Sequence, residues 1–188
     1  MNEELLVTSG TLLVAWPDLM DPNFMHSVVA VCQHSEDGAY GLVTNQRTTF
    51  TVRDLLPDHP LLGKSSFPVH LGGPVDHSTM QFLHRVPKEI PGGLCLDGEL
   101  WLGGELEAMA RFACGDASEA SRSLRVFLGY SGWGAGQLED ELKGGTWLPA
   151  ASTREAIFGE EGEPAWRSVI RTVGPEGFDD LPPEVSWN

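Results

Sequence analysis

The residues best suited to chemistry in this sequence lie in and after a glycine-rich segment, residues 129–136. The segment lacks the lysine of a phosphate-binding Walker loop, and Trp133 stands where a nucleophile elbow around Ser131 requires its last glycine. Glycine loses more backbone freedom on folding than any other residue, so a glycine run favours places where chains approach closely or a ligand meets the backbone. We therefore interpret the segment as a tight turn between a strand and a helix, with a role in binding rather than in covalent chemistry.

Cys32 is the candidate nucleophile for a thiol-dependent enzyme. It ends an apolar run, residues 28–32, which predicts a buried strand and an unreactive thiol. His34 would face the same side of that strand and would lower the pKa of the thiol if the pair were partly exposed. The other cysteines, Cys95 and Cys114, are widely spaced and form no CxxC pattern, which indicates reduced thiols in a cytoplasmic protein.

Three of the six histidines, His70, His77 and His84, flank a turn at Gly72-Gly73-Pro74. A hairpin that brought His70 opposite His84 would create a place for a metal ion, but no HxH or HxxEH spacing supports one. We expect these side chains to be surface or half-buried histidines. We expect no metal site and no cofactor.

The charge of the chain argues against nucleic acid as a direct partner. Its 188 residues carry 12 Lys and Arg against 27 Asp and Glu, a net charge of -15. Binding to duplex DNA draws most of its affinity from phosphate contacts and needs a basic surface, and the sequence has no Lys/Arg cluster. Glu3 and Glu4 stand where a signal peptide is basic, and no apolar run approaches the roughly 20 residues of a membrane span. We expect a cytoplasmic protein without membrane contact.

The elements that position these residues follow a mixed α/β pattern. The apolar run at 12–16 predicts a strand buried on both faces, and residues 27–44 predict a hairpin around Asp37-Gly38. Apolar periodicity predicts helices later in the chain, at 106–113, 137–143 and 164–173. Because hairpins dominate the first hundred residues and helices the second half, the pattern favours an α+β fold over a doubly wound parallel sheet. We expect one domain over residues 1–174 and an acidic C-terminal tail at 175–188.

Several blocks of residues between 10 and 150 together resemble the YqgE/AlgH family. They are Gly10-Thr11-Leu12-Leu13-Val14-Ala15, Asp21-Pro22 with Phe24, Gly41-Leu42-Val43 with Asn45, Gly72-Gly73-Pro74-Val75, and Gly129-Tyr130-Ser131-Gly132-Trp133 with Gly136-Gln137-Leu138-Glu139. The resemblance implies a bacterial cytoplasmic protein with an antiparallel-rich sheet curled into a partial barrel and helices packed outside. It also implies a family of largely uncharacterised proteins, one name of which carries a transcriptional-regulator label.

If the sheet curls, these blocks would converge on one shallow cleft. We expect the cleft to serve binding and to be lined by Asp21, Asn45, Tyr130, Trp133, Gln137 and Glu139. Tyr130 and Trp133 would supply aromatic surface, and Gln137 and Glu139 would supply hydrogen-bonding groups at the start of a helix.

Two classes of function remain open from the sequence. The leading hypothesis is a non-enzymatic binding or regulatory protein that acts through protein or small-molecule partners, because no catalytic constellation is evident. The alternative is a small hydrolase or thiol-dependent enzyme that uses a carboxylate in the cleft or Cys32.

Overall fold

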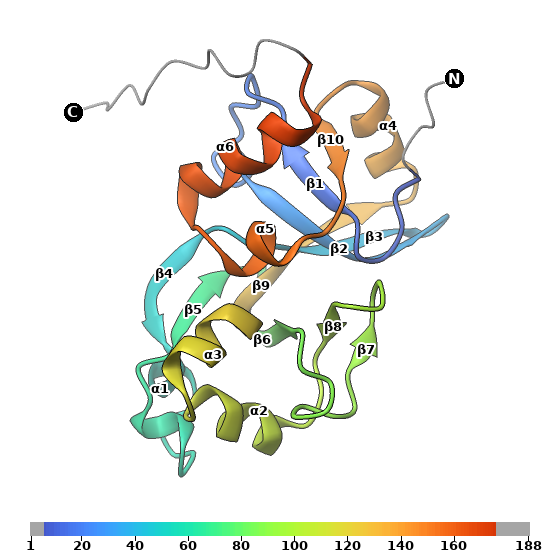
Figure 1. Ribbon diagram of the computed structural model, residues 1–188. Helices are drawn as coiled ribbons and strands as arrows, with labels where there is room; N and C mark the ends of the chain where they lie inside the picture. Colours follow the sequence, from blue (N-terminus) through green and yellow to red (C-terminus); the bar gives the residue numbers. More distant parts are fainter. Residues whose placement is uncertain (1–5, 176–188) are drawn as a thin grey trace, which may run out of the picture.

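The computed structural model describes residues 6–175 of the chain, and within them strands and helices alternate irregularly (Figure 1). The strands are β1 Leu12–Ala15, β2 Val28–Ser35, β3 Gly38–Val43, β4 Arg47–Thr51, β5 Pro68–Leu71, β6 Val75–His84, β7 Leu94–Cys95, β8 Trp101–Leu102, β9 Leu124–Gly134 and β10 Trp147–Ala150. The helices are α1 Val52–Leu55, the short 3-10 helix η1 Leu62–Lys64, α2 Leu106–Ala113, α3 Ala117–Ser123, α4 Gln137–Lys143, α5 Arg154–Phe158 and α6 Gly162–Val173. Apart from Pro175, the predicted acidic tail lies outside the described residues.

The long strand β9 joins the two halves of the sheet. The order is β10-β1-β2-β3-β9-β6-β8-β7, and the ladder of β4 and β5 attaches to β9 as well. β9 pairs with β3 and β6 in antiparallel fashion, whereas its pairing with β5 is parallel. The predicted α+β class is confirmed: the sheet is antiparallel-rich, lies among helices, and does not close into a complete barrel.

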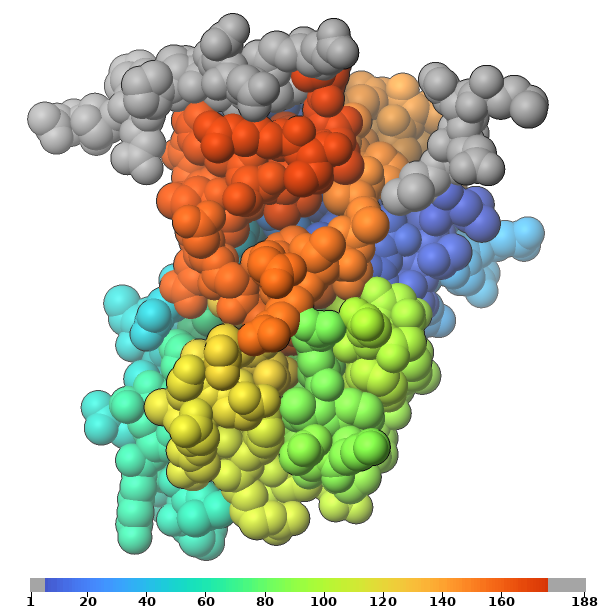
Figure 2. All heavy atoms as spheres, viewed as in Figure 1, coloured from blue at the N-terminus to red at the C-terminus, as the bar shows by residue number. Residues whose placement is uncertain are grey.

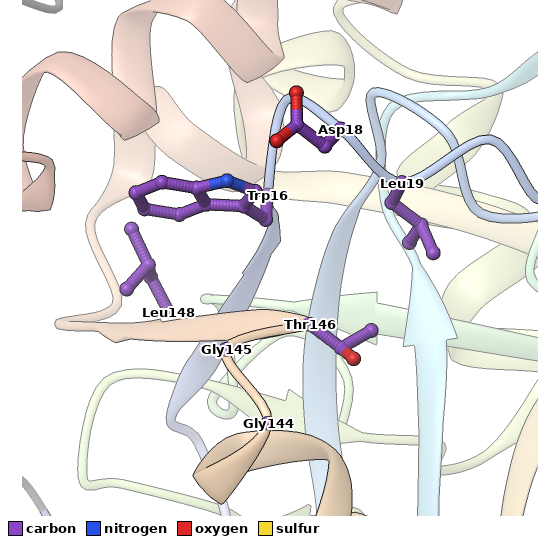
Figure 3. A pocket seen from close by; sticks show the side chains of 7 residues that line it. All are labelled: Trp16, Asp18, Leu19, Gly144, Gly145, Thr146 and Leu148. Atoms are coloured by element: carbon purple, nitrogen blue, oxygen red, sulfur yellow. The ribbon is translucent and has the colours of Figure 1, made fainter.

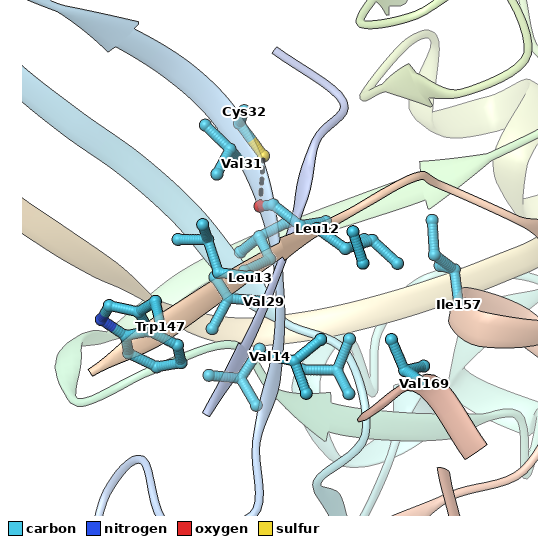
Figure 4. Packing of buried hydrophobic residues seen from close by; sticks show 14 of the residues in the cluster. Leu12, Leu13, Val14, Val29, Val31, Cys32, Trp147, Ile157 and Val169 are labelled. Carbon is cyan, nitrogen blue, oxygen red and sulfur yellow. Dashed lines mark hydrogen bonds between the residues drawn. The ribbon is translucent and has the colours of Figure 1, made fainter. Parts of the chain in front are cut away.

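The larger of two hydrophobic cores, which we call the first core, lies between β1, β2, β3 and β10 and the helices α4 to α6. Leu12 and Leu13 point to opposite faces of β1, and both are fully buried, which explains why this strand is an unbroken apolar run (Figure 4). α6 buries the predicted stripe that contains Trp166, Val169 and Ile170. The Nε1 of Trp166 donates to the carbonyl of Ala15 at 2.7 Å, so the helix is also tied to the strand beneath it.

The second core lies between β5, β6 and β9 and the helices α1 and α2. Its buried members are fewer than those of the first core and include Phe82, Met109 and Val126. Figure 2 shows the segment that ends in α6, drawn in orange and red, packed above the yellow and green segment that contains α2 and α3.

The prediction of a turn throughout residues 129–136 is wrong, because β9 continues to Gly134 and pairs there with β3. Glycines on both sides allow the backbone at Gly72 and Gly73 to cross very close to this strand. A Cβ atom on Gly73 would lie 2.2 Å from the Tyr130 carbonyl carbon, and one on Gly72 would lie 2.4 Å from the Gly129 carbonyl oxygen. Only glycine leaves room for such an approach.

Two short helices, α3 and α5, have no counterpart among the predicted elements. Each begins at a side-chain cap: Asp116 accepts from the Glu119 N–H at 2.8 Å, and Thr153 accepts from the Ala156 N–H at 3.1 Å. Within residues 6–175, no helix has the length and apolar character needed to cross a bilayer.

Candidate functional site

Three hollows of the surface surround α4 and the strand ends beside it. The most apolar of them, which we call the His34 pocket, has a volume of about 480 Å³. Its lining comes from the chain before β1, from β2, from α4 and from β10: Leu6, Val7, His34, Glu139, Leu142, Lys143 and Pro149. Of the residues predicted to bind a ligand, Glu139 lies in this pocket.

α4 is held in place by the glycines before it and by two tryptophans behind it. Gly136 precedes the helix with φ 76°, a left-handed conformation that favours glycine. The carboxylate of Glu141 accepts hydrogen bonds from the Nε1 groups of Trp133 and Trp147, at 2.9 and 2.8 Å. These two bonds fix α4 against β9 and β10 and so position the wall of the His34 pocket.

The polar centre of the His34 pocket is a pair formed by His34 and Glu139. The Nδ1 of His34 lies 2.8 Å from the carbonyl oxygen of Val7, and its Nε2 lies 2.6 Å from Oε1 of Glu139. Because a carbonyl and a carboxylate both accept hydrogen bonds, the two contacts together favour the doubly protonated ring. The Val7 carbonyl and then Glu139 raise the pKa of His34 against the effect of burial.

The same contact lowers the pKa of Glu139, for which the largest cause is the hydrogen bond from its own backbone N–H at the start of α4. Below the raised pKa of His34, the pair is therefore an imidazolium next to a carboxylate. Lys143 adds a further positive charge one turn later on the helix. Below the raised pKa of His34, the charged groups of the pocket thus carry a net charge of about +1.

The hollow beside Trp16 has a volume of about 540 Å³, and Figure 3 shows the side chains that line it. Trp16, just after β1, and Leu148 of β10 face one another in it. Asp18 is the single charged side chain among the residues that line the hollow. A smaller hollow of about 220 Å³ is lined in part by Tyr40 and Trp133. These hollows offer aromatic surface, but they do not combine cationic and apolar groups as the His34 pocket does.

The structure places the other predicted residues in different surroundings. Tyr130 packs on Tyr40, with ring centroids 5.1 Å apart, and Gln137 donates to Glu141 while accepting from the Gly134 N–H. Asp21 is exposed and accepts from the N–H of Asn23 at 2.8 Å, which closes a local turn.

Asn45 is buried, and its amide is used by the fold. Its Oδ1 accepts from the Val28 N–H at 3.0 Å, and its Nδ2 donates to the carbonyls of His26 and Gly162, both at 2.9 Å. It ties the end of β3 to the start of β2 and to the start of α6. Its side chain therefore serves as an internal brace and offers no free polar group to a ligand.

The structure gives Cys32 and Ser131 structural surroundings. Cys32 is 1% exposed, as predicted, and burial raises the pKa of its thiol to about 12. Partial exposure of the pair, the condition under which His34 would lower this pKa, is not met. A register shift between Val31 and Gln33 also disrupts the alternation of β2, and His34 binds Val7 and Glu139. Ser131 is buried, and its hydroxyl donates to the Gly72 carbonyl at 3.1 Å.

Sequence reasoning missed a second group of charged side chains, at the junction of the two halves of the sheet. Arg125 of β9 is 5% exposed, and its Nη1 donates to the Thr44 carbonyl at 2.8 Å. His70 of β5 is 2% exposed, and its Nε2 lies 2.9 Å from Oε1 of Glu161. The Glu161 carboxylate also lies 3.8 Å from Nη2 of Arg125.

The expectation of surface or half-buried histidines is wrong for His70 and His84, which are almost fully buried. Both are strand residues: His84 donates to the Gly103 carbonyl and accepts from the Val86 N–H, which satisfies both of its nitrogens. Burial, followed by the charge of Arg125, lowers the pKa of His70 to about 4. Among the residues that the structure describes, no three His, Cys, Asp or Glu side chains group as ligands for a metal ion.

Comparison with known proteins places this architecture in one family. The model of an AlgH-like family, DUF179, matches residues 12–177. A UPF0301 protein of Chlorobaculum tepidum is 35% identical over 93% of this chain and 91% of its own length, and one of Cytophaga hutchinsonii is 34% identical over 90% and 91%.

Two solved structures share the fold. The solution structure of the AlgH protein from Pseudomonas aeruginosa matches with a TM-score of 0.71 and 27% identity, over 93% of this chain and 94% of that one. The crystal structure of protein DIP2367 from Corynebacterium diphtheriae matches with a TM-score of 0.72 and 22% identity, over 94% and 92%. From the family match and these relatives, the chain belongs to the AlgH-like UPF0301 family.

Proposed function

We propose that this chain is a non-enzymatic binding protein whose His34 pocket takes a small molecule with an apolar body and a carboxylate group. The observation that carries the proposal is the joining of apolar walls with a net positive centre. Leu6, Val7, Leu142 and Pro149 supply the walls, and the charged groups are His34, Glu139 and Lys143. Small-molecule sites commonly combine a predominantly apolar lining with a few polar groups that fix the orientation of the ligand.

The charges of the pocket indicate which group of the ligand binds where. Glu139 already neutralises His34 at 2.6 Å, so the ammonium of Lys143 is the cation left to pair with an anionic ligand. A carboxylate would gain an ion pair with Lys143 while its hydrocarbon body covers Leu142 and Pro149.

The surroundings of the candidate nucleophiles support binding rather than catalysis. Both ring nitrogens of His34 are engaged, so this histidine has no lone pair with which to accept a proton. The Cys32 thiol is buried with its pKa raised to about 12, and the Ser131 hydroxyl donates to a backbone carbonyl. The proposal therefore does not include a hydrolase or a thiol-dependent enzyme.

The proposal also covers the cellular location of the protein and its role there. We expect it in the bacterial cytoplasm, where the protein would play a regulatory role by passing ligand occupancy on to a protein partner. The net charge of -15 opposes direct binding to nucleic acid.

Calorimetric titration with decanoate and with decanol tests the assignment of the ligand. At pH 6.5 we expect decanoate to bind, and decanol to bind at least about tenfold more weakly because it gains no ion pair. Lys143→Gln should weaken decanoate binding by a similar factor, whereas Lys88→Gln, which removes an exposed lysine outside the pocket, should leave it unchanged. Equal binding of both probes, or equal effects of both substitutions, would contradict the proposal.

Thiol labelling tests the alternative of a thiol-dependent enzyme. In a Cys95→Ser, Cys114→Ser variant, Cys32 should react with a disulfide reagent only after denaturant is added, because it is buried in the first core. The exposed cysteines of the unmodified chain should react at once. Rapid labelling of native Cys32 would restore the thiol-dependent alternative.

A further inference from the structure

Three basic or polar side chains from neighbouring strands converge on a single carboxylate. Arg47 comes from β4, His70 from β5 and Arg125 from β9, and all three contact Glu161 just before α6. The loop that carries Glu161 passes from α5 to α6 beside the start of β4 (Figure 1). We call these four residues the Arg125 cluster.

The carboxylate of Glu161 is an incomplete counterion for the two guanidinium groups. Nη2 of Arg125 lies 3.8 Å from Oε1, and Nη1 of Arg47 lies 3.7 Å from Oε2, both beyond hydrogen-bond distance. Only His70, whose Nε2 lies 2.9 Å from Oε1, is at hydrogen-bond distance from the carboxylate. Two positive charges therefore face one negative charge.

His70 takes part as a neutral donor. The low pKa of its ring leaves it uncharged at neutral pH, and a neutral ring that contacts a carboxylate through Nε2 must carry its proton there. Its Nδ1 is buried and has no hydrogen-bond partner in the described part of the chain. The ring is thus held with its single N–H directed at the position of the Glu161 carboxylate.

The two other glutamates next to Glu161 in sequence do not neutralise the guanidinium groups of the Arg125 cluster. Glu163 pairs with Arg167 at 2.6 Å, and Glu160 is exposed. The side chains of Arg47 and Glu161 are 55% and 31% exposed, so one side of the cluster is open to solvent.

We propose that Arg47, Arg125 and the Nε2–H of His70 form a binding site for a phosphate-type dianion, and that Glu161 occupies the site as an internal competitor. Two negative charges on one group would balance both guanidiniums, which a single carboxylate does not. The planar fork of arginine suits the paired oxygens of phosphate, and the His70 N–H supplies a further hydrogen bond.

Displacing Glu161 requires movement of a short segment. Gly159 and Gly162 lie on either side of Glu160-Glu161, and Gly162 has φ 64°, a conformation that favours glycine. The loop is also held by Asn45 and by the bond from Arg125 to the Gly159 carbonyl at 3.3 Å. We therefore expect phosphate to bind the unmodified protein weakly, because it must replace a covalently attached competitor.

Titration with inorganic phosphate at constant ionic strength, followed by protein NMR, tests the proposal. Glu161→Ala should bind phosphate at least about tenfold more tightly than the unmodified chain, since the competitor is gone. Glu160→Ala removes the same charge from the adjacent position and should change the affinity less than about threefold. Adding Arg47→Gln to Glu161→Ala should reverse most of the gain.

Several results would overturn the proposal. Equal gains from Glu160→Ala and Glu161→Ala would show that only net charge matters, and acetate binding to Glu161→Ala as tightly as phosphate would remove the assignment to a dianion. If Glu161→Ala does not fold, Glu161→Gln keeps the shape of the side chain and should show the same order of affinities with a smaller gain. Failure of that variant to gain affinity would also contradict the site.

Discussion

His34 and Glu139 meet at the surface beside α4, whereas His70 and Glu161 meet beneath the loop between α5 and α6. Both contacts join Nε2 to a carboxylate oxygen, at 2.6 and 2.9 Å. Yet the pKa of His34 is raised and that of His70 is lowered to about 4. The same two residue types therefore form an ion pair in one place and a hydrogen bond to a neutral ring in the other.

The difference comes from what surrounds each ring. His34 donates its second N–H to the Val7 carbonyl, which stabilises the protonated ring, and its side chain remains 17% exposed. His70 is 2% exposed, has no acceptor at Nδ1 and lies near the charge of Arg125. A carboxylate alone thus does not make a histidine cationic, because desolvation and a nearby cation outweigh it at the buried position.

Removing Arg125 is the strongest way to break this contrast. Arg125→Met should raise the pKa of His70 towards that of His34, because a cation that opposes its protonation is gone. It should also lower the free energy of unfolding by about 3 kcal/mol, since the Thr44 and Gly159 carbonyls lose their donor and Glu161 loses a cation. Urea unfolding measures the loss of unfolding free energy, and histidine NMR titration measures the pKa of His70. A His70 pKa that stays near 4 would mean that burial alone sets it.

Replacing each glutamate by glutamine should sharpen the contrast. Glu161→Gln leaves the buried Arg125 without an anion and should cost about 1–3 kcal/mol of unfolding free energy. Glu139→Gln should cost less, because its side chain is 38% exposed and water replaces the lost contact. It should nevertheless lower the pKa of His34. Equal losses in urea unfolding would contradict the distinction between a buried and an exposed pair.

The two histidines should give the pH dependence of stability opposite signs, and the contribution of His34 is the smallest of the expected effects. The raised pKa of His34 means that its stabilisation is complete below the ordinary value of about 6.5 and is lost as the pH rises through the folded-state pKa. The lowered pKa of His70 means that its contribution is present above about 6.5 and is lost as the pH falls towards 4.

A comparison with His34→Gln isolates the first of these contributions. The stability advantage of the unmodified chain over this variant should be below about 1 kcal/mol at pH 6 and should shrink further by pH 8.5. Urea unfolding at several pH values measures it. An advantage that grows with pH would mean that His34 is neutral in the folded protein.

The fold was predictable wherever one local pattern decided the structure. The apolar runs of β1 and β2, the turn at Asp37-Gly38 and the stripe of α6 all follow from spacing along the chain. α3 and α5 were not predictable in this way, because they are short and depend on single caps at Asp116 and Thr153. The strand character of residues 131–134 depends on pairing with β3, which no local pattern reveals.

The candidate site was predictable only in part. Glu139, which the sequence placed in a binding cleft, does line the His34 pocket. Asn45 instead braces the fold, because its hydrogen bonds join segments that are distant in sequence. The pairing of His34 with Glu139 spans 105 residues, and that of His70 with Glu161 spans 91. Glu161 is hidden in the acidic stretch at 160–163, where nothing distinguishes it from its neighbours until the chain is folded.

The position of β9 has a consequence for the order in which the protein is assembled during synthesis. β3, β5 and β6 leave the ribosome well before β9, the strand that they all pair with, so one edge of each stays unmatched until residues 124–134 have emerged. Neither sheet half is complete before that moment, and a nascent chain stalled earlier would expose edges prone to aggregation. Both cores thus depend on this one strand, which contributes Phe127 to the first core and Val126 to the second.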